Sequence, residues 1–349
     1  MVLLTAALPG CLADRIAAGF TAPPNGGRAA ADDPLPRPAF FDDAGTLTVP
    51  GPPPATLAAW VLHPAPARVT HVPPGTTPPP PPPGWRSVTA HPTPRFGHLR
   101  VARGPVRHTP PVATVLLLHG RGGDAHRSDT LRPLAAALAD AGARVVAVDL
   151  RGHGQSTGGF VSYGHLEVPD LQRVLDELQR LDPDAGPFAV VGHSYGGGVA
   201  VQLAAADPRV RRVLALAPLV ELDPARLPRV RFFLKHVRPV VHLFFGWALD
   251  DDLIASSKAR MEARTGADLS RDNALRRVTE LHDVPVLVLQ GGRDPATPLS
   301  GSARLRDARP GLVELIVYPD ADHTSFLRED WQNVEARTRR WLKALAAGP

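Results

Sequence analysis

The residues best suited to catalysis are those of the segment Gly192-His193-Ser194-Tyr195-Gly196. The apolar run at residues 188–191 predicts a strand before it, and residues 195–206 predict a helix after it. A serine hydroxyl is a weak nucleophile at neutral pH and needs an exposed position beside a base. A sharp turn from strand to helix provides that exposure, and only small residues fit at positions 192 and 196. The segment therefore predicts that Ser194 is the nucleophile of an acyl transfer.

A second glycine-rich segment, His119-Gly120-Arg121-Gly122-Gly123, directly follows the apolar run at residues 113–118. The chain must turn back beneath the nucleophile there, so backbone amides of this loop can donate to the oxyanion of a tetrahedral intermediate. We expect the two donors to be the amides of Arg121 and of Tyr195, the residue after the nucleophile. We expect His119 to hold the loop by hydrogen bonds rather than to take part in the reaction.

The general base is expected late in the chain, at His323 in the segment Asp320-Ala321-Asp322-His323. This segment lies between a strand expected to end at Tyr318 and the last helix. That position is a loop at the carboxyl edge of the sheet, where the sites of such folds collect. The other histidines considered lie in less suitable loops, beside the nucleophile or in a long insertion: His153, His193, His236, His242 and His282.

The acid that would orient the imidazole is expected at Asp294, in Gly291-Gly292-Arg293-Asp294-Pro295. Asp294 follows the strand expected at residues 284–289 and completes the chain order Ser, Asp, His. An aspartate before proline can also be a simple turn residue. The rival acids are Asp322, which is very close in sequence to His323, and Glu221 and Asp223 after the preceding strand.

Strands and helices alternate after residue 113, which predicts a parallel sheet covered by helices on both faces. Strands are expected at residues 113–118, 144–148, 188–191, 213–217, 284–289 and 312–318. Helices are expected at residues 129–141, 166–181, 195–206, 300–308 and 326–346. Residues 85–90 and 97–102 are expected to form two antiparallel strands ahead of this region.

One long stretch, residues 221–283, interrupts the alternation and predicts a cap. It contains Phe232-Phe233-Leu234 and Leu243-Phe244-Phe245-Gly246-Trp247. Aromatic residues in a cap suggest an apolar pocket, which would suit a substrate with an apolar acyl group. The alternative is that these residues only seal the cap against the core.

The N-terminal part of the chain differs in composition, because more than half of the 40 prolines precede residue 111. Residues 78–83 are an unbroken proline run, which favours an extended spacer. We therefore expect residues 12–84 to be largely irregular, with short elements at most at 46–49 and 56–62. The globular domain is expected to span residues 85–349.

Charge and cysteine content limit the remaining possibilities. The net charge is +5, but the basic residues are scattered, which argues against a nucleic-acid partner. The single cysteine, Cys11, excludes an internal disulfide and a zinc site built from several cysteines. Residues 1–11 form a short apolar run ending in Leu-Pro-Gly-Cys and resemble a lipoprotein signal, although no Lys or Arg precedes the run. We therefore favour a cell-envelope protein anchored by lipidated Cys11 over a cytoplasmic one.

Taken together, these motifs resemble the α/β-hydrolase superfamily over residues 97–346. The resemblance also rests on Asp149-Leu150-Arg151-Gly152-His153-Gly154-Gln155-Ser156, a loop that we expect to be structural. It implies a mostly parallel eight-stranded sheet flanked by helices, with a helical cap insertion. It also implies a triad of Ser194, Asp294 and His323, and neither a cofactor nor a metal.

A serine nucleophile in this setting predicts a hydrolase for a small-molecule carboxylic ester or thioester, because alkoxide and thiolate leave more readily than amine. It argues against haloalkane and epoxide chemistry, for which some relatives carry aspartate instead. An aminopeptidase or amidase is the alternative, and the acidic residues that could hold an amine are Glu221, Asp223, Asp250, Asp251 and Asp252. A second alternative is a non-catalytic envelope protein that uses the fold for binding.

Overall fold

The architecture is taken from a computed structural model of the chain, which describes residues 13–27, 35, 40–222 and 251–347. The predictions for Cys11 and for the aromatic part of the cap lie outside the described residues. For residues 251–254 the structure describes the backbone alone.

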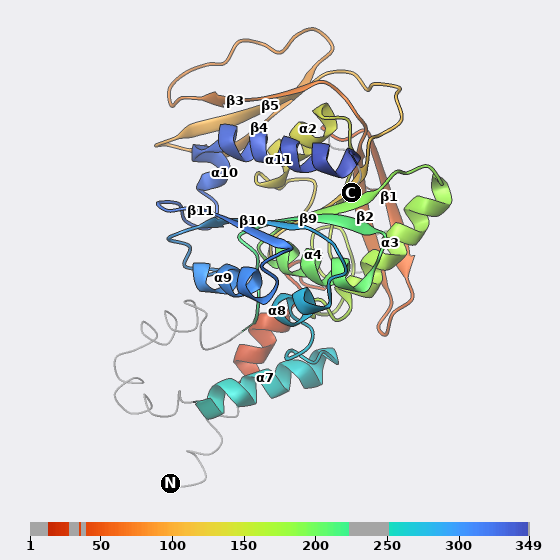
Figure 1. Cartoon of the computed structure of the whole chain (residues 1–349), viewed down its shortest axis with the longest axis vertical. Coiled ribbons are helices and arrows are strands. Elements are labelled where there is room, and N and C mark those ends of the chain that lie inside the picture. Colours follow the sequence, from red (N-terminus) through yellow and green to blue (C-terminus); the bar gives the residue numbers. More distant parts are fainter. Residues whose placement is uncertain (1–12, 28–34, 36–39, 223–250, 348–349) are drawn as a thin grey trace.

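A central sheet of eight strands organises the molecule, in the order β1-β2-β7-β6-β8-β9-β10-β11 (Figure 1). The pairs β1–β2 and β2–β7 are antiparallel, and the pairs from β7 to β11 are parallel. This confirms the predicted mostly parallel eight-stranded sheet. The strands are β1 Asp43–Val49, β2 Ala55–Leu62, β6 Thr114–Leu118, β7 Arg144–Val148, β8 Phe188–His193, β9 Val210–Leu216, β10 Val286–Gly291 and β11 Val313–Tyr318.

Helices cover both faces of this sheet, and each face has its own apolar core (Figure 1). The helices α2 Leu131–Asp140 and α11 Trp331–Ala346 pack on one face, together with the short α10 Phe326–Glu329. The other face is covered by α3 Glu167–Leu181, α4 Tyr195–Ala206, α8 Ala274–Arg277 and α9 Leu299–Ala308. Every residue of β6 and β8 is buried, as expected of strands packed on both sides.

The expectation that residues 12–84 are largely irregular is wrong. The two antiparallel strands β1 and β2 extend the main sheet beyond β7, and residues 13–21 form a helix. The prolines that made this region look irregular lie between the strands rather than inside them, so β2 keeps its ladder of hydrogen bonds. Trp60 of β2 is fully buried. The globular domain therefore begins well before residue 85.

A separate three-stranded sheet lies beside α2, in the order β3-β5-β4 (Figure 1). Its strands are β3 Ala67–Val72, β4 Arg86–Thr93 and β5 Gly97–Arg103. The predicted antiparallel pairing of residues 85–90 with 97–102 is confirmed by β4 and β5. Arg103 at the end of β5 is fully buried and binds Asp42, the residue before β1.

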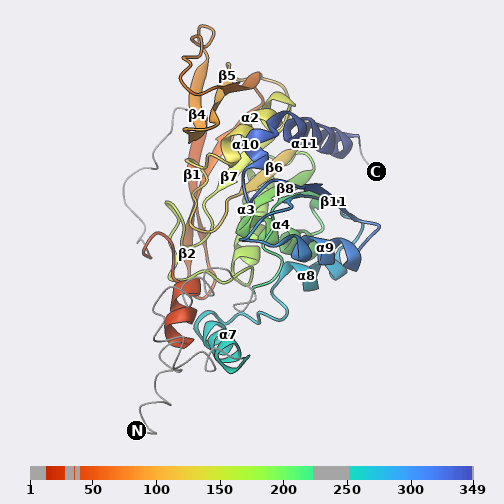
Figure 2. The same ribbon diagram turned by 90° about the vertical axis from the view of Figure 1, so that its left-hand side faces the viewer.

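Part of the predicted cap segment is described. It contains α7 Asp251–Thr265, α8 and a short 3-10 helix, Val278–Glu280. The helix α7 stands away from the sheet and lies beside the helix at residues 13–21 (Figures 1 and 2). Within the described segments, no helix combines the length and the apolar character needed to cross a membrane.

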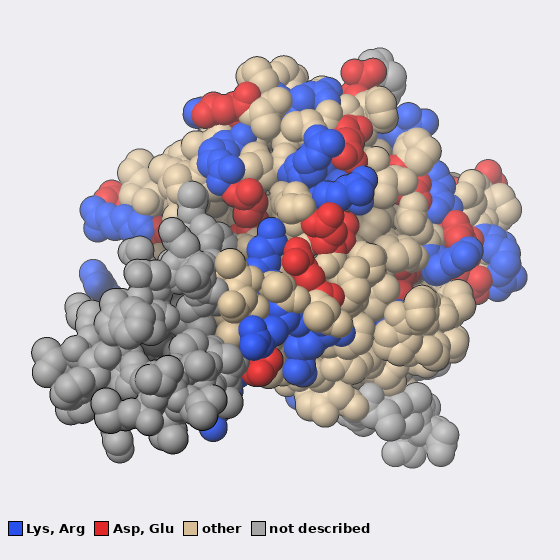
Figure 3. All heavy atoms as spheres, turned by 90° about the horizontal axis from the view of Figure 1, so that it is seen from below, with Lys and Arg blue, Asp and Glu red and all other residues tan. Residues whose placement is uncertain are grey.

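Charged side chains are interspersed on the face of the molecule seen in Figure 3. Arginines lie next to carboxylates rather than in a patch of one sign, and many of them form ion pairs, such as Arg277 with Asp272. This distribution agrees with the scattered basic residues of the sequence.

Candidate active site

Ser194 sits at the turn from β8 to α4, at the carboxyl edge of the sheet. Its backbone has φ 53° and ψ −115°, a left-handed conformation that is strained for a residue with a side chain. Its amide donates to Leu216 O at the end of β9 (2.8 Å), and its carbonyl accepts from Leu219 N (2.8 Å). The end of β9 and the loop that follows it therefore hold the strained turn in place.

The glycines on either side of this turn are required by close packing. A Cβ on Gly192 would lie 2.2 Å from Gly196 O. A Cβ on Gly196 would lie 2.6 Å from both Leu118 O and His119 O. No side chain fits at either position, so the turn must pass directly against the end of β6.

His323 and Asp294 are brought together by the loops that follow β11 and β10. His323 Nδ1 lies 2.7 Å from Asp294 Oδ2, and the Asp294 side chain is completely buried while His323 is partly exposed. An ionised carboxylate can only accept hydrogen bonds, so Nδ1 carries the proton. The lone pair of the imidazole is then on Nε2, the nitrogen that faces away from Asp294.

Asp294 is surrounded by donors. Its carboxylate accepts hydrogen bonds from the amides of Ala296 and Thr297 (2.8 and 2.9 Å) and from the side chain of Gln290 (3.0 Å). Burial alone would raise the pKa of this carboxyl, but the hydrogen bonds from His323 and Thr297 outweigh it and lower the pKa below its usual value. Asp294 is therefore ionised at neutral pH.

Ser194 and His323 belong to the same edge of the sheet. The ring of His193, the residue before Ser194, lies 4.9 Å from the His323 ring, measured between centroids. Among the described residues, no hydrogen bond joins Ser194 Oγ to His323. The structure thus forms the pair of His323 and Asp294 and places Ser194 on the same edge of the sheet.

The loop after β6 packs directly against the serine turn. A Cβ on Gly120 would lie 2.9 Å from His193 Nδ1 and 3.4 Å from Ser194 Cβ. The backbone amides of Arg121 and Tyr195 donate to no acceptor in the described part of the chain. Both amides thus lack an acceptor among the described residues, as the expected oxyanion donors would.

His119 has the structural arrangement expected from the sequence. Its Nε2 accepts from Leu150 N (3.0 Å), so its Nδ1 carries the proton and donates to Gly120 O (2.8 Å). Burial, with a smaller contribution from neighbouring His153, lowers its pKa to about 3. A ring that is uncharged at neutral pH therefore links this loop to the loop after β7.

The rival acids are engaged elsewhere. Asp322 Oδ1 accepts from the amides of Thr324 and Ser325 (2.9 Å each) and so stabilises its own turn. Glu221 pairs with Arg304 of α9. Asp223 lies outside the described residues, as do His236 and His242.

Two polar residues that contact Asp294 were not predicted from the sequence. Thr297 Oγ1 lies 2.8 Å from Asp294 Oδ2, 3.0 Å from Ala217 O and 3.2 Å from His323 Nδ1. Gln290 is fully buried, donates to Asp294 and accepts from Ser302 Oγ (2.7 Å). A glutamine inside the otherwise apolar strand β10 was the available signal, because a buried amide needs specific partners.

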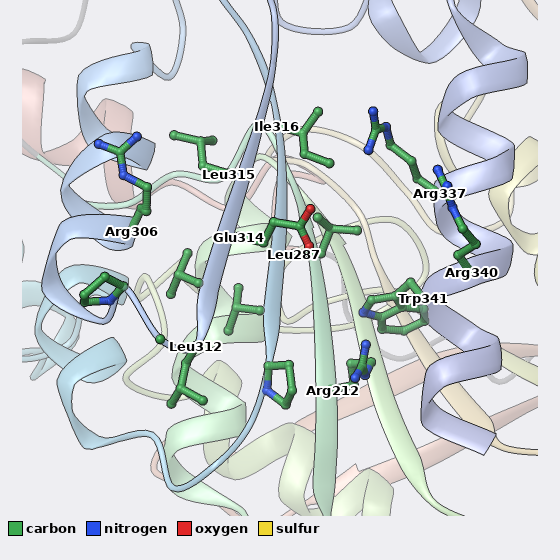
Figure 4. Close-up of a pocket in the computed structure, with 15 residues that line it drawn as sticks. Arg212, Leu287, Arg306, Leu312, Glu314, Leu315, Ile316, Arg337, Arg340 and Trp341 are labelled. Carbon is green, nitrogen blue, oxygen red and sulfur yellow. The ribbon is translucent and has the colours of Figure 1, made fainter. Parts of the chain in front are cut away.

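A cavity of about 820 Å³ lies far from these residues (Figure 4). It follows the amino-terminal parts of β10 and β11, whereas the candidate site lies at the carboxyl ends of the strands. Its walls include Arg212, Arg306, Glu314 and Arg340. It therefore plays no part in the candidate site.

The described residues hold no cluster of three or more His, Cys, Asp or Glu that could bind a metal.

Comparison with known proteins identifies the family and the fold. Residues 115–337 match the model of the alpha/beta hydrolase family. The pimeloyl-[acyl-carrier protein] methyl ester esterase of Neisseria meningitidis is 30% identical over 241 residues, which cover 62% of this chain and 88% of the relative. The dihydrolipoyllysine-residue acetyltransferase component of the acetoin cleaving system of Cupriavidus necator is 33% identical over 237 residues. That match covers 61% of this chain but only 59% of the longer relative.

A solved structure shows the same fold. The esterase Pf2001 of Pyrococcus furiosus superposes with a TM-score of 0.59, covering 88% of this chain and 93% of its own. The two sequences are only 18% identical, so this likeness concerns the fold alone.

Proposed function

Because the chain belongs to the alpha/beta hydrolase family, we propose that it is a serine hydrolase that cleaves a carboxylic ester or thioester through an acyl-serine. The observation that carries the proposal is the buried Asp294 bound to His323 at 2.7 Å, on the same sheet edge as Ser194. The names of relatives, which include esterases and lipases, support an ester as the substrate.

In the proposed acylation step, Nε2 of His323 removes the proton of Ser194 Oγ as the oxygen attacks the substrate carbonyl. The amides of Arg121 and Tyr195 donate to the oxyanion that forms, and the N-terminus of α4 favours its negative charge. His323 then passes the proton to the leaving alkoxide or thiolate. In deacylation, His323 removes a proton from water as the water attacks the acyl-serine carbonyl. The proton then returns to Ser194 Oγ, and the carboxylic acid is released.

Asp294 has two roles in this scheme. It keeps the proton of the resting imidazole on Nδ1, and it stabilises the imidazolium that forms during the reaction. Its lowered pKa suits both roles, because the carboxylate stays charged throughout the neutral range.

The proposed substrate is a small ester with an apolar acyl group. An amide or peptide substrate is less well supported, because Glu221, one of the residues that could hold an amine, is already paired with Arg304.

The experiment that tests the proposal is hydrolysis of p-nitrophenyl esters from acetate to palmitate. We expect hydrolysis by the natural protein, loss of it in Ser194→Ala, and no change in Ser87→Ala, which alters an exposed serine of β4. The preferred chain length then gives the size of the acyl pocket. If Ser194 reacts with a fluorophosphonate but no ester is cleaved, the amidase alternative replaces the ester hydrolase. If Ser194 is not labelled and no ester is hydrolysed, the non-catalytic binding protein becomes the favoured alternative.

A further inference from the structure

The helix at residues 13–21 is an integral part of the catalytic side of the molecule, although it is distant from Ser194 in sequence. Ala13, Ala17 and Thr21, which are spaced one helical turn apart, are fully buried and form one face. Ala17 belongs to the same apolar core as Tyr195 and Met261 of α7. Figure 2 shows this helix beside α7.

The last carbonyl groups of this helix have no hydrogen-bond donors in the following turn. In a helix, the carbonyls of Gly19 and Phe20 would accept from the amides of residues 23 and 24, but both of these are proline and have no N–H. Arg121 supplies the missing donors, because its guanidinium NH2 group donates to Gly19 O (2.8 Å) and Phe20 O (3.0 Å). A cation also suits the partial negative charge of a helix C-terminus.

Residues of the loop after β7 also bind the end of this helix. The Tyr163 hydroxyl donates to Phe20 O (2.9 Å), and Val161 N donates to Thr21 O (2.9 Å). The next residues are bound as well, because the Asn25 side chain donates to Ser156 O (2.7 Å). The end of the helix at residues 13–21 is therefore held in position independently of Arg121.

The start and the end of the helix also bind the described part of the cap segment. Arg260 of α7 lies 2.7 Å from Asp14, and Arg264 of α7 donates to the Thr21 hydroxyl (3.2 Å). The helix thus connects α7 to the loop that contains Arg121.

His119 and Gly120 hold the start of this loop against neighbouring turns, but Arg121 and Gly122 lie exposed at its tip. Arg121 is the only residue from 120 to 123 with a side chain, because the other three are glycine. Gly122 has φ +79°, and a Cβ placed on it would meet nothing within 4 Å. The exposed tip at Gly122 has high backbone entropy, so a tether through the neighbouring Arg121 side chain would restrict it effectively.

We propose that the helix at residues 13–21 positions the loop at residues 119–123. It does so by binding the side chain of Arg121, whose backbone amide is the proposed donor to the oxyanion. This inference rests on the proposed function for the role of that amide. Arg121 then acts twice, as a backbone donor in the reaction and as a side-chain link that orients this donor.

The test compares Arg121→Met, which keeps an unbranched side chain but removes the charge and the donors, with Arg121→Lys. Arg127→Met is the matched control, since Arg127 is an exposed arginine near the same loop and its side chain makes no bond to the helix. With the best p-nitrophenyl ester we expect Arg121→Met to lower kcat at least about tenfold, a part of the loss caused by removing an oxyanion donor. KM should change little, Arg121→Lys should recover part of kcat, and the control should match the natural protein.

Hydrogen–deuterium exchange of residues 119–123 provides a second measurement that does not require esterase activity. We expect faster exchange in Arg121→Met than in the natural protein and in Arg127→Met. Unchanged kcat and unchanged exchange would overturn the proposal. So would a fall in kcat without faster exchange in the loop, or one that the lysine does not relieve. If the natural protein cleaves no ester, the proposed function fails, whereas faster exchange would still show that the helix restrains this loop.

Discussion

At the scale of single residues, Asp294 shows how burial and hydrogen bonding compete. Its carboxylate is completely buried, which by itself disfavours the charge. Hydrogen bonds from the His323 ring and from the amide and hydroxyl of Thr297 reverse that effect. The result is a fixed negative charge against one nitrogen of His323, which leaves the other nitrogen as a base.

Asp294→Asn should therefore lower kcat strongly while the fold is kept, because asparagine has the same shape but no charge. We expect a loss on the order of 10⁴-fold, the size seen when a catalytic imidazole loses its carboxylate partner. The measurement is kcat on the best ester, corrected for the fraction of Ser194 that a fluorophosphonate labels. Asp320→Asn is the control, because the Asp320 side chain is 84% exposed. A loss below tenfold would mean that Asp294 is not the acid.

Thr297 should support the same pair. Its hydroxyl lies within 3.2 Å of His323 Nδ1 and within 3.0 Å of both Asp294 and Ala217 O. Thr297→Val removes this hydroxyl at nearly constant volume, and we expect kcat to fall about tenfold, corresponding to one hydrogen bond to a charged group. Thr297→Ser should restore most of the activity in the same assay. Equal activity of the valine and serine variants would show that the hydroxyl is not needed.

At the scale of elements, a buried ion pair joins the three-stranded sheet to the main sheet. Arg103 at the end of β5 donates two hydrogen bonds to Asp42 (2.7 and 3.0 Å), and its side chain is fully buried. Asp42 also binds Arg86 of β4 (2.6 Å) and the amide of His63 (2.9 Å). One carboxylate thus fixes the position of two strands relative to β1.

Asp42→Ala should destabilise the protein substantially, because it leaves the Arg103 charge buried without a carboxylate to balance it, although the carbonyls of Phe40 and His63 still accept from it. We expect the free energy of unfolding to fall by about 3–5 kcal/mol. Asp307→Ala, which breaks an exposed ion pair with Arg306, should change it by less than about 1 kcal/mol. Urea unfolding of the two variants measures both values, and similar small losses would show that the Arg103 pair is unimportant for stability.

At the scale of the whole molecule, several histidines are buried in neutral form. Burial is the main cause that lowers the pKa to about 3 for His119 and His193 and to about 4 for His91. A histidine in an unfolded chain titrates near pH 6.5. The unfolded state therefore binds more protons than the folded state between these values, and stability falls as the pH falls below about 6.5. Asp149 opposes this trend, because burial raises its pKa to about 7.

The contribution of one such histidine can be isolated with His91→Asn. Asparagine tolerates the positive φ of 52° at this position. The variant should flatten the dependence of the unfolding free energy on pH between 6 and 4.5 by up to about 1.4 kcal/mol per pH unit. His108→Asn, at an exposed position, should leave the slope unchanged in the same series of urea titrations. Identical slopes for His91→Asn and the natural protein would contradict a buried neutral His91.

The sequence by itself determined those features that follow from local chemistry. The apolar runs predicted the parallel strands, since a strand covered on both faces must be apolar throughout. The glycines at positions 192 and 196 predicted a tight turn around Ser194. The positions of Asp294 and His323, each just after a strand, predicted that both would reach the carboxyl edge of the sheet.

Only the tertiary structure decided what depends on contacts between distant segments. The sequence indicated short elements at 46–49 and 56–62, but not that they pair as β1 and β2 and extend the main sheet beyond β7, because strand pairing is set by the partner strand. Thr297 and Gln290 became relevant only when β9, β10 and β11 were placed side by side. The bond of Arg121 to the helix at residues 13–21 joins segments about a hundred residues apart, and no local pattern encodes it. Such contacts arise from packing, which a single sequence does not display.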